Sequence, residues 1–593
     1  MFFCDVAVPL CGMAISLFAR FRVLFTGNKG HHGTCEISRR IFGKYLVCLF
    51  ALCLGLSSLS IMAENDTEPV RVFIFAGQSN MVGSDSHVKD IKNFPPFRGL
   101  EESQEGVRFS YCIGRENKMR SNGWVDLQPV DGVVGPELSF AREVRSKLDA
   151  PIAIIKCAAG GTHLGGDWNP DDPSGFRMYP VLMDLVRDSL ARLDADKIPY
   201  RMEGFMWHQG ENDMFNASYM AEYGTNLSRF IECVRRDLNA PNLRFYIGEL
   251  CTKTIWGMDL RPRMFAISLG QKSVTQKDPL AQYIHTSHVG VEIGRPVGLH
   301  YHYGTLGQLE HGVNYAEAYL KNIGLLKPIV RPLKRWPYPQ GKKVKLFVLT
   351  GHRNMEGERA FVQELRTLDE WKKLVEDQND IAFKYDIGGG YRVSNGWEPL
   401  GPIGYYDTFG PELSFGAEMN KHHPGSVAIA KFTHSGSQII DWTPEGSEAP
   451  SRNLYPKFLE FVQNSMKELK SKGHDVELSG VFYHLGENDM SFHPYRKQAA
   501  TRLVSIIRQT RIDLEMPELK WYVTQQAPLD HENLNKVDVL ADVSNKLESD
   551  PFTQHIKVGE LPGMEKELII STEGILELGQ LLARAYIKSV QDN

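Results

Sequence analysis

A serine stands just past the end of a predicted strand, where its hydroxyl could react with a substrate. Residues 72–76 form an apolar, β-favouring run that stops at Gly77, two positions before Ser79. Ligands of open α/β sheets bind at the carboxyl ends of the strands, so the Ser79 hydroxyl is expected to face a ligand. The competing interpretation is that Gly77 to Asn80 is only a turn.

A serine nucleophile needs a base, usually a histidine, and hydrogen-bond donors for the oxyanion that forms after attack. Gly160 and Asn212 each follow a predicted strand, where a backbone or side-chain amide can donate to an oxyanion. His300 precedes the last helix predicted in the first half of the chain, and His302 is the alternative base. These residue types predict acyl transfer through Ser79.

The elements that must position these residues alternate between strand and helix. The predicted strands are 70–76, 151–158, 203–208, 243–250 and 281–286. The predicted helices are 136–148, 178–193, 219–238 and 304–320. Alternation of this kind predicts an α/β fold with a parallel central sheet and helices on both faces.

The chain repeats itself after roughly 270 residues, with the order of its motifs kept. Three of the repeated motifs are Ser-Asn-Gly-Trp (121–124 and 394–397), Gly-Pro-Glu-Leu-Ser-Phe (135–140 and 410–415) and Gly-Glu-Asn-Asp-Met (210–214 and 486–490). Two tandem domains of one fold are therefore predicted, at 66–326 and 343–593. The segment between them, 327–342, is proline-rich, which predicts an extended linker.

The second copy lacks the residues that could do this chemistry. Arg353 stands at the position of Ser79, and a guanidinium that is always charged cannot act as a nucleophile. Aligning the last helices of the two copies puts Glu567 opposite His300. The second domain is therefore predicted to be non-catalytic.

The front of the chain, 1–63, is predicted to be an extension that ends in a signal peptide. Basic residues within 39–44 precede an apolar stretch at 45–56, and Ala63 offers a small residue for cleavage. The alternative is a membrane anchor that the protein keeps. We expect a secreted or periplasmic protein without a membrane span after cleavage.

Composition narrows the function classes. The chain is 42% hydrophobic and 23% charged, as in ordinary globular proteins. Its net charge of −5, with scattered basic residues, predicts no nucleic-acid partner. The cysteines after the front end permit disulfides in an exported protein, but none has a Cys-x-x-Cys spacing, so no zinc site is predicted. These cysteines are Cys112, Cys157, Cys233 and Cys251.

Motifs in the first domain resemble those of the SGNH (GDSL-like) hydrolases, and more closely their sialate O-acetylesterase and acetylxylan esterase branch. The motifs are Gly77-Gln78-Ser79-Asn80-Met81, Gly135-Pro136-Glu137, Gly160-Gly161-Thr162, Trp207-His208-Gln209-Gly210-Glu211 and Gly298-Leu299-His300. The resemblance implies a flavodoxin-like, three-layer α/β/α fold and hydrolysis of acetyl esters on sugars without a metal or cofactor. It implies that Ser79 is the nucleophile and His300 the base. It also implies an oxyanion hole formed by the Ser79 amide, Gly160 and Asn212.

The sequence departs from this family at one important position. The family usually has an aspartate three residues before the histidine, and Val297 stands there. Glu292 is the nearest upstream carboxylate and does not clearly replace that aspartate. The aspartate orients the imidazole and stabilises its charged form, although some relatives use a Ser–His pair with a backbone carbonyl instead.

The sequence thus predicts a secreted carbohydrate O-acetylesterase with one working site and an O-acetylated sugar as substrate. Two alternatives remain. One is a carbohydrate-binding or scaffold protein whose first domain has lost catalysis. The other is an esterase for acyl groups on molecules other than sugars.

Overall fold

The computed structural model describes most of the chain after its front end. The described residues are 68–251, 253–255, 258–291, 301–327, 329–447, 452–491, 493–525, 536–559, 561–562, 564–565 and 568–591. The predicted extension and signal peptide at 1–63 lie outside them, as do Glu292, Val297, His300 and Glu567. Contacts group residues 68–593 into one compact unit.

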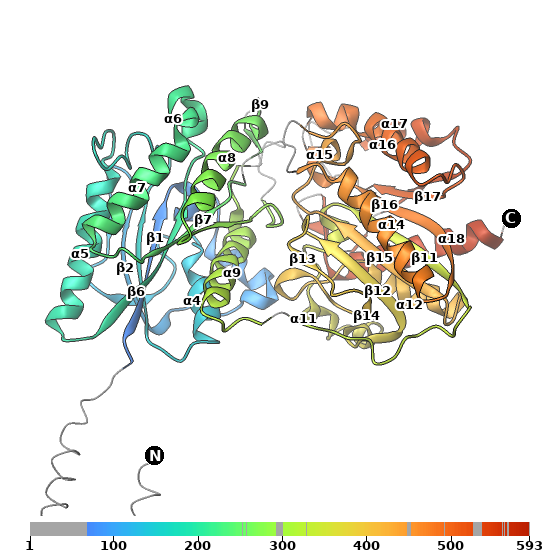
Figure 1. Cartoon of the computed structure of the whole chain (residues 1–593), viewed down its shortest axis with the longest axis horizontal. Coiled ribbons are helices and arrows are strands. Elements are labelled where there is room, and N and C mark those ends of the chain that lie inside the picture. Colours follow the sequence, from blue (N-terminus) through green and yellow to red (C-terminus); the bar gives the residue numbers. More distant parts are fainter. Residues whose placement is uncertain are drawn as a thin grey trace, which may run out of the picture. The chain divides into compact units, whose positions relative to one another are not determined.

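The first domain is built on a sheet whose middle strand leads to the serine (Figure 1). The strands of this sheet are β1 (Val70–Gly77), β2 (Gln104–Ile113), β3 (Met119–Arg120), β4 (Val125–Leu127), β5 (Ile152–Ala158), β6 (Tyr200–His208), β7 (Arg244–Gly248) and β10 (Ala281–Ile284). Their order is β10-β7-β6-β1-β5-β2-β3, and β1 is parallel to both β5 and β6. β3 and β4 pair antiparallel with β2, so the parallel sheet has an antiparallel edge.

Helices cover both faces of this sheet (Figure 1). They are α3 (Ser79–Val82), α4 (Glu137–Arg145), α5 (Met178–Ala195), α6 (Ala217–Ala221), α7 (Tyr223–Asp237), α8 (Arg261–Lys277) and α9 (Gly304–Asn322), with short turns η1 (Val88–Asn93), η2 (Pro95–Phe97) and η3 (Asp213–Phe215) and the ribbon β8 (Thr254–Ile255) and β9 (Met258–Asp259). One apolar cluster joins Val72 and Ile74 of β1 to α5, α7 and α8, and another joins Phe73 and Phe75 to α4 and α9. Successive side chains of a strand point to opposite faces, so β1 is buried on both sides of a three-layer α/β/α domain.

The predicted strands and helices of the first domain are all present, with ends displaced by no more than three residues. The predicted helix 219–238 is divided at Glu222 into α6 and α7. The short strands β3, β4, β8 and β9 and the short helix α3 were not predicted, and two longer elements, β2 and α8, were also missed. The first residues of β2 are polar and exposed, and α8 carries Gly270 against Gly224 of α7, so neither shows a regular apolar pattern.

The second domain repeats this architecture. Its strands are β11 (Lys343–Gly351), β12 (Gln378–Ile387), β13 (Arg392–Val393), β14 (Glu398–Leu400), β15 (Val427–Thr433), β16 (Asp475–Leu485), β17 (Trp521–Gln525) and β18 (Thr553–Lys557), and a separate ribbon has β19 (Met564–Glu565) and β20 (Ile569–Ile570). The sheet order, β13-β12-β15-β11-β16-β17-β18, matches that of the first domain strand for strand. The prediction of two tandem three-layer α/β domains is confirmed.

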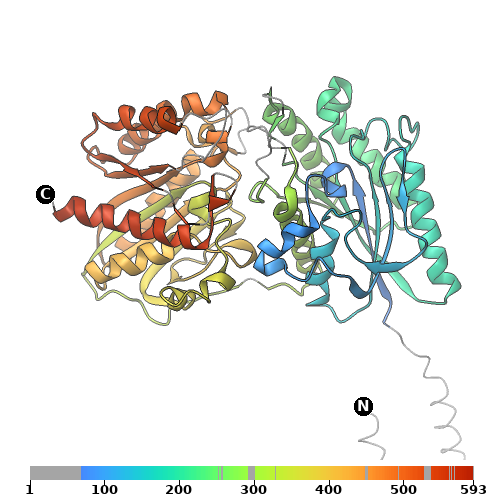
Figure 2. The ribbon, with the colours of Figure 1, turned by 180° about the vertical axis from the view of Figure 1, so that it is seen from behind.

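The helices of the second domain also follow the first. They are α10 (Arg353–Glu356), α11 (Val362–Leu365), α12 (Glu412–His422), α13 (Ile439–Trp442), α14 (Tyr455–Ser471), α15 (Glu487–Ser491), α16 (His493–Asp513), α17 (Lys536–Leu547) and α18 (Thr572–Gln591), with the short turns η4 (Lys372–Val375) and η5 (Tyr405–Asp407). α12 packs against α18 as α4 packs against α9, and Figure 2 shows α18 in red beside α12.

Two structural findings concern the predicted export of the protein, one on its cysteines and one on its helices. The four cysteines of the two domains, Cys112, Cys157, Cys233 and Cys251, are buried free thiols, so the disulfides that the sequence permits are not formed. Within the described part of the chain, no helix combines the length and the apolar character needed to cross a bilayer.

Candidate active site

The turn after β1 places Ser79 at the carboxyl edge of the sheet. Gly77 has φ +153°, and a Cβ there would overlap the backbone oxygen of His208 on the neighbouring strand, so a side chain is excluded. Ser79 then begins the short helix α3, which ends at Gly83 in the left-handed conformation. Ser79 is 6% exposed, and it lines a surface cavity.

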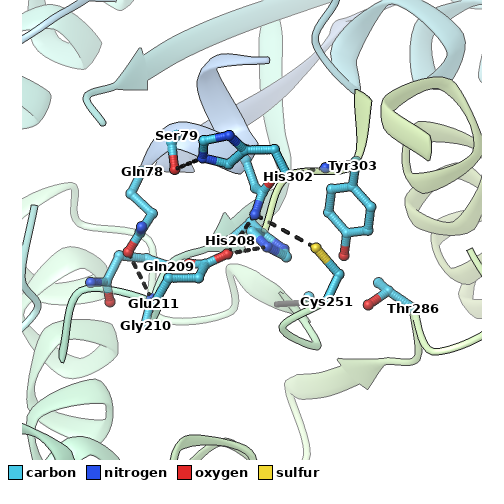
Figure 3. A network of polar contacts seen from close by, with 12 residues as sticks. Gln78, Ser79, His208, Gln209, Gly210, Glu211, Cys251, Thr286, His302 and Tyr303 are labelled. Atoms are coloured by element: carbon cyan, nitrogen blue, oxygen red, sulfur yellow. Dashed lines mark hydrogen bonds and ion pairs between the residues drawn. The ribbon is translucent and has the colours of Figure 1, made fainter. Parts of the chain in front are cut away.

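The imidazole of His302 lies against this hydroxyl (Figure 3). Its Nε2 is 3.0 Å from Ser79 Oγ, within the range for direct proton transfer. His302 lies two residues before α9, and its side chain is 15% exposed. The hydroxyl and the ring come from segments 223 residues apart.

A carboxylate holds the other nitrogen of the ring. Asp85 Oδ2 is 2.6 Å from His302 Nδ1, so Nδ1–H can donate to the carboxylate while Nε2 accepts from Ser79. Asp85 has φ +61°, a left-handed conformation that aspartate tolerates, and its side chain is 71% exposed. The hydrogen bond from His302 lowers the pKa of Asp85, despite the opposing effect of partial burial.

The structure therefore brings Ser79 together with the alternative base. His300, predicted as the base, lies outside the described residues, so that prediction is not tested. The sequence argument missed Asp85 because it looked for a carboxylate only near the histidine. A signal was present, since Asp85 follows the predicted nucleophile by six residues in a polar segment.

The three residues predicted to form the oxyanion hole line one cavity of about 510 Å³. Gly160 lies close to Ser79, because a Cβ on Gly160 would be 3.5 Å from the Cβ of Ser79. Asn212 lines the same cavity from the turn after β6. Ser79 begins a helix, where the first amides have no intrahelical acceptor. The three residues predicted to form the oxyanion hole therefore lie around one cavity beside the hydroxyl.

Other residues that line this cavity were not identified from the sequence. They are Arg115, Phe215, Ile255 and Tyr301, whereas Gly161, which also lines the cavity, belongs to the predicted Gly160-Gly161-Thr162 motif. Arg115 follows β2, the strand that the sequence argument missed, and Ile255 belongs to the small ribbon before α8. The sequence did not indicate that these residues share a site, because the strands β2 and β8, which place Arg115 and Ile255 at the cavity, were not predicted.

A buried polar network holds the serine turn in place (Figure 3). Gln78 Oε1 accepts from the backbone N–H of Gly210 at 3.1 Å, which ties the turn after β1 to the turn after β6. Asn80 Nδ2 donates to Glu211 Oε1 at 2.7 Å, and Asn80 Oδ1 accepts from the Tyr303 amide at 3.2 Å. Asn80 thereby connects the serine turn to the residue after His302.

The charge of Glu211 is stabilised in this network. Burial opposes ionisation, but His208, with its Nε2 3.2 Å from Glu211 Oε1, and the amide of Asn80 hold the pKa of Glu211 below its ordinary value. His208 is completely buried. This pair therefore supports the turn after β6 and does not face the cavity.

The equivalent edge of the second domain has different side chains. Arg353 replaces Ser79 and is buried in an ion pair with Glu358, with Arg353 Nη2 2.6 Å from Glu358 Oε1. Asn354 Oδ1 accepts from the amide of Ile570 at 2.9 Å, as Asn80 does from Tyr303, so Ile569 corresponds to His302. The predicted counterpart of His300, Glu567, lies outside the described residues. Neither a hydroxyl nor an imidazole stands at these two positions.

Within the described ranges, no group of three or more His, Cys, Asp or Glu side chains is arranged to hold a metal ion.

Comparisons with known proteins agree with the repeat. A family model described as "Carbohydrate esterase, sialic acid-specific acetylesterase" matches residues 69–321 and again residues 343–588. A probable carbohydrate esterase of Arabidopsis thaliana is 27% identical over 272 residues, which cover 44% of this chain and 94% of that protein.

Solved structures give further matches. The structure of the Arabidopsis thaliana protein is 22% identical, with a TM-score of 0.32, over 43% of this chain and 99% of that one. A carbohydrate acetylesterase from Xanthomonas citri is 15% identical, with a TM-score of 0.31, over 46% of this chain and 61% of that one. With the family model matching both halves, the chain belongs to the carbohydrate esterase family of sialic acid-specific acetylesterases, with the family domain present twice.

Proposed function

We propose that the first domain removes acetyl groups from carbohydrate hydroxyls, with Ser79 as the nucleophile and His302 as the base. The alignment of Asp85, His302 and Ser79, with contacts of 2.6 and 3.0 Å, is the observation that carries the proposal. Membership of a carbohydrate esterase family supports the substrate class. His302 thus takes the role that the sequence argument predicted for His300.

In the first half of the reaction, the Ser79 hydroxyl attacks the acetyl carbonyl carbon while Nε2 of His302 takes its proton. The carbonyl oxygen becomes an oxyanion. When this tetrahedral intermediate collapses, the bond between the acetyl carbon and the sugar oxygen breaks. The proton on His302 passes to that oxygen, so the sugar leaves as an alcohol and Ser79 carries the acetyl group.

In the second half, His302 accepts a proton from water, and the resulting hydroxide attacks the acetyl carbon of the acyl-enzyme. The bond to Ser79 Oγ then breaks, His302 returns the proton to Oγ, and acetate leaves. Asp85 stays ionised throughout and stabilises the imidazolium that forms twice in each cycle.

The oxyanion is stabilised by the donors that line the cavity. The amides of Ser79 and Gly160, with the side-chain amide of Asn212, fill this role in the proposed mechanism. Each such donor contributes roughly 10²-fold or more to the rate, because it acts where charge develops in the transition state. No cofactor takes part in these steps.

The assignment of Ser79 and His302 as catalytic residues also gives the two domains different roles. We assign catalysis to the domain at 66–326 and a non-catalytic role to the domain at 343–593, joined by the linker at 327–342. The predicted signal peptide would deliver the enzyme outside the cell or into the periplasm, where acetylated polysaccharides and glycans occur.

The test is acetate release by the full-length wild-type protein and by Ser79→Ala. The substrates are acetylated xylan, O-acetylated sialic acid, a chromogenic acetate ester and its longer-chain homologues. Wild-type protein should deacetylate a carbohydrate, and Ser79→Ala should lose at least about 10⁴-fold in kcat/KM. Preference for longer acyl esters would favour a non-sugar esterase. Equal rates for both proteins would leave only the binding or scaffold alternative.

A further inference from the structure

A loop of the first domain covers the surface of the second domain that corresponds to the Ser79 cavity. We call residues 286–291, which follow β10, the covering loop. Ser435 Oγ donates to the backbone oxygen of His288 at 2.8 Å, and both residues are buried. A Cβ on Gly436 would overlap the backbone oxygen of Ser287, so the two backbones are in direct contact.

The contacting residues of the second domain stand where the first domain has its ligand cavity. Ala158 pairs with Gly77 at the end of β1, and Thr433 pairs with Gly351 at the end of β11. Counting on from these strand ends, Ser435 corresponds to Gly160, which lines the Ser79 cavity. The covering loop therefore lies where the first domain keeps space for a substrate.

Further contacts hold His288, at the centre of the covering loop. Its ring stacks on Tyr391 with ring centres 3.6 Å apart, and its Nε2 is 3.2 Å from Tyr406 Oη. Both tyrosine hydroxyls also donate to Asn314 Oδ1 on α9, at 3.0 and 2.6 Å. Burial lowers the pKa of His288 to about 3, so the ring is neutral and adds no charge to this aromatic contact.

Charged residues close the other end of the covering loop. A Cβ on Gly290 would overlap the carboxylate of Glu358, so only glycine leaves room for that side chain. Glu358 is the buried partner of Arg353, the residue at the nucleophile position of the second domain. The amide of Gly290 donates to Glu310 Oε2 on α9 at 3.0 Å, so the covering loop is also attached to its own domain.

The covering loop is physically connected to the proposed base. Val289 and Val291 form a small buried cluster with Cys251 and Tyr303. Tyr303 directly follows His302, and Figure 3 shows Tyr303 and Cys251 beside the Ser79–His302 pair. Movement of the covering loop would therefore move the packing that supports His302.

We propose that the second domain positions the base of the first domain. The surface around Ser435 and Gly436, which corresponds to the Ser79 cavity, acts as a docking surface that holds the covering loop. Because the covering loop packs on Tyr303, the docking surface also holds His302 against Ser79. The proposal rests on the assignment of His302 as base. Its physical basis is the sensitivity of catalysis to geometry, because a displacement of about 1 Å can cost roughly 10²-fold in rate. A loop needs such external support, since loops are otherwise more mobile than the elements they join.

The test uses Gly436→Ala in the full-length protein. The added methyl group cannot fit beside Ser287, so the docking surface should separate from the covering loop. Gly559→Ala is the matched control, because Gly559 is an exposed glycine of the same domain with no neighbour for a Cβ. We expect kcat to fall by roughly 10- to 100-fold in Gly436→Ala, with KM changed by less than about threefold, and no change in the control.

A structural readout accompanies the kinetics. Hydrogen exchange of peptides spanning residues 286–303 should become faster in Gly436→Ala and stay at the wild-type rate in Gly559→Ala. If Gly436→Ala does not fold, Tyr391→Phe is used, because it removes the hydroxyl that donates to Asn314 while keeping the stack on His288. A smaller change in the same direction is expected for it.

Normal kcat and unchanged exchange in a folded docking variant would overturn the proposal. Failure of the proposed function gives a different pattern, in which wild-type protein and Ser79→Ala have equal activity. In that case hydrogen exchange alone decides whether the second domain holds the covering loop.

Discussion

The two domains share a backbone and differ in what stands at the edge of their central strand. β1 and β11 both end in a glycine with positive φ, 153° in Gly77 and 140° in Gly351, and both lead into a short helix closed by a left-handed glycine. The first domain places Ser79 at that helix start, and the second places Arg353 there. The turn geometry is therefore a property of the fold, and the two domains differ in the side chain that stands at the start of the helix.

What both domains retain supports this distinction. His208 and Glu211 are in contact at 3.2 Å, and their counterparts His484 and Glu487 at 3.3 Å, all fully or almost fully buried. The pair is also present in the second domain, which has no serine at the position of Ser79. We therefore infer that it supports the backbone of the turn that follows β6 or β16 and takes no part in the reaction. The second domain lacks the residues of the proposed catalytic centre. Ile569 occupies the position of His302, and Arg359 occupies the position of Asp85.

The sharpest test of this difference replaces the residue at the base position of each domain by alanine. His302→Ala should lower kcat/KM by at least about 10⁴-fold, because the proton of Ser79 then has no acceptor. Ile569→Ala, at the same place in the second domain, should leave kcat/KM within about twofold and lower only stability, by about 2–4 kcal/mol. Initial rates and thermal unfolding measure the two effects. If the large loss belongs to His300→Ala instead, the base is the residue that the sequence argument favoured.

The second test asks whether a hydroxyl can restore chemistry to the second domain. Arg353→Ser in a Ser79→Ala background should give no ester hydrolysis, because no base lies opposite and the covering loop fills the space. The same change should lower the free energy of unfolding by about 3–5 kcal/mol, since Glu358 stays buried and keeps only the longer contact of 3.8 Å with Arg359 in place of the 2.6 Å pair with Arg353. Denaturant unfolding with and without Glu358→Gln measures this cost. Turnover in the double variant would show that the second site is open.

The third test weighs Asp85 against another exposed aspartate. Asp85→Asn should lower kcat by roughly 10²-fold, less than a buried triad carboxylate, because water can partly replace an exposed oxygen. Asp131→Asn is the control, since Asp131 also has a left-handed backbone, with φ +54°. The hydrogen bond from His302 lowers the pKa of Asp85, so this carboxylate is ionised from about pH 5 to 8, and Asp85→Asn should be slower than wild type throughout that range. A ratio of wild-type to variant rates near one would remove Asp85 from the mechanism.

The sequence argument worked where the signal is local. The apolar run before Gly77 predicted β1, and the repeated motifs predicted the second domain and placed Arg353 at the position of Ser79. It failed for the short strands and for β2 and α8, whose partly polar faces lack a clean period, and so it also missed Arg115 in the cavity. Element ends differ by a few residues because helix and strand termini depend on the contacts they meet.

By itself, the amino-acid sequence determined the strand, the glycine turn and the serine at its end, because apolar runs, backbone freedom and helix starts act between neighbours in the chain. Only the tertiary structure decided which imidazole and which carboxylate meet that serine. Asp85 and His302 are 217 residues apart, and their contact exists because two turns converge at one edge of a sheet. Such a convergence depends on packing across the whole domain, and no spacing along the chain records it.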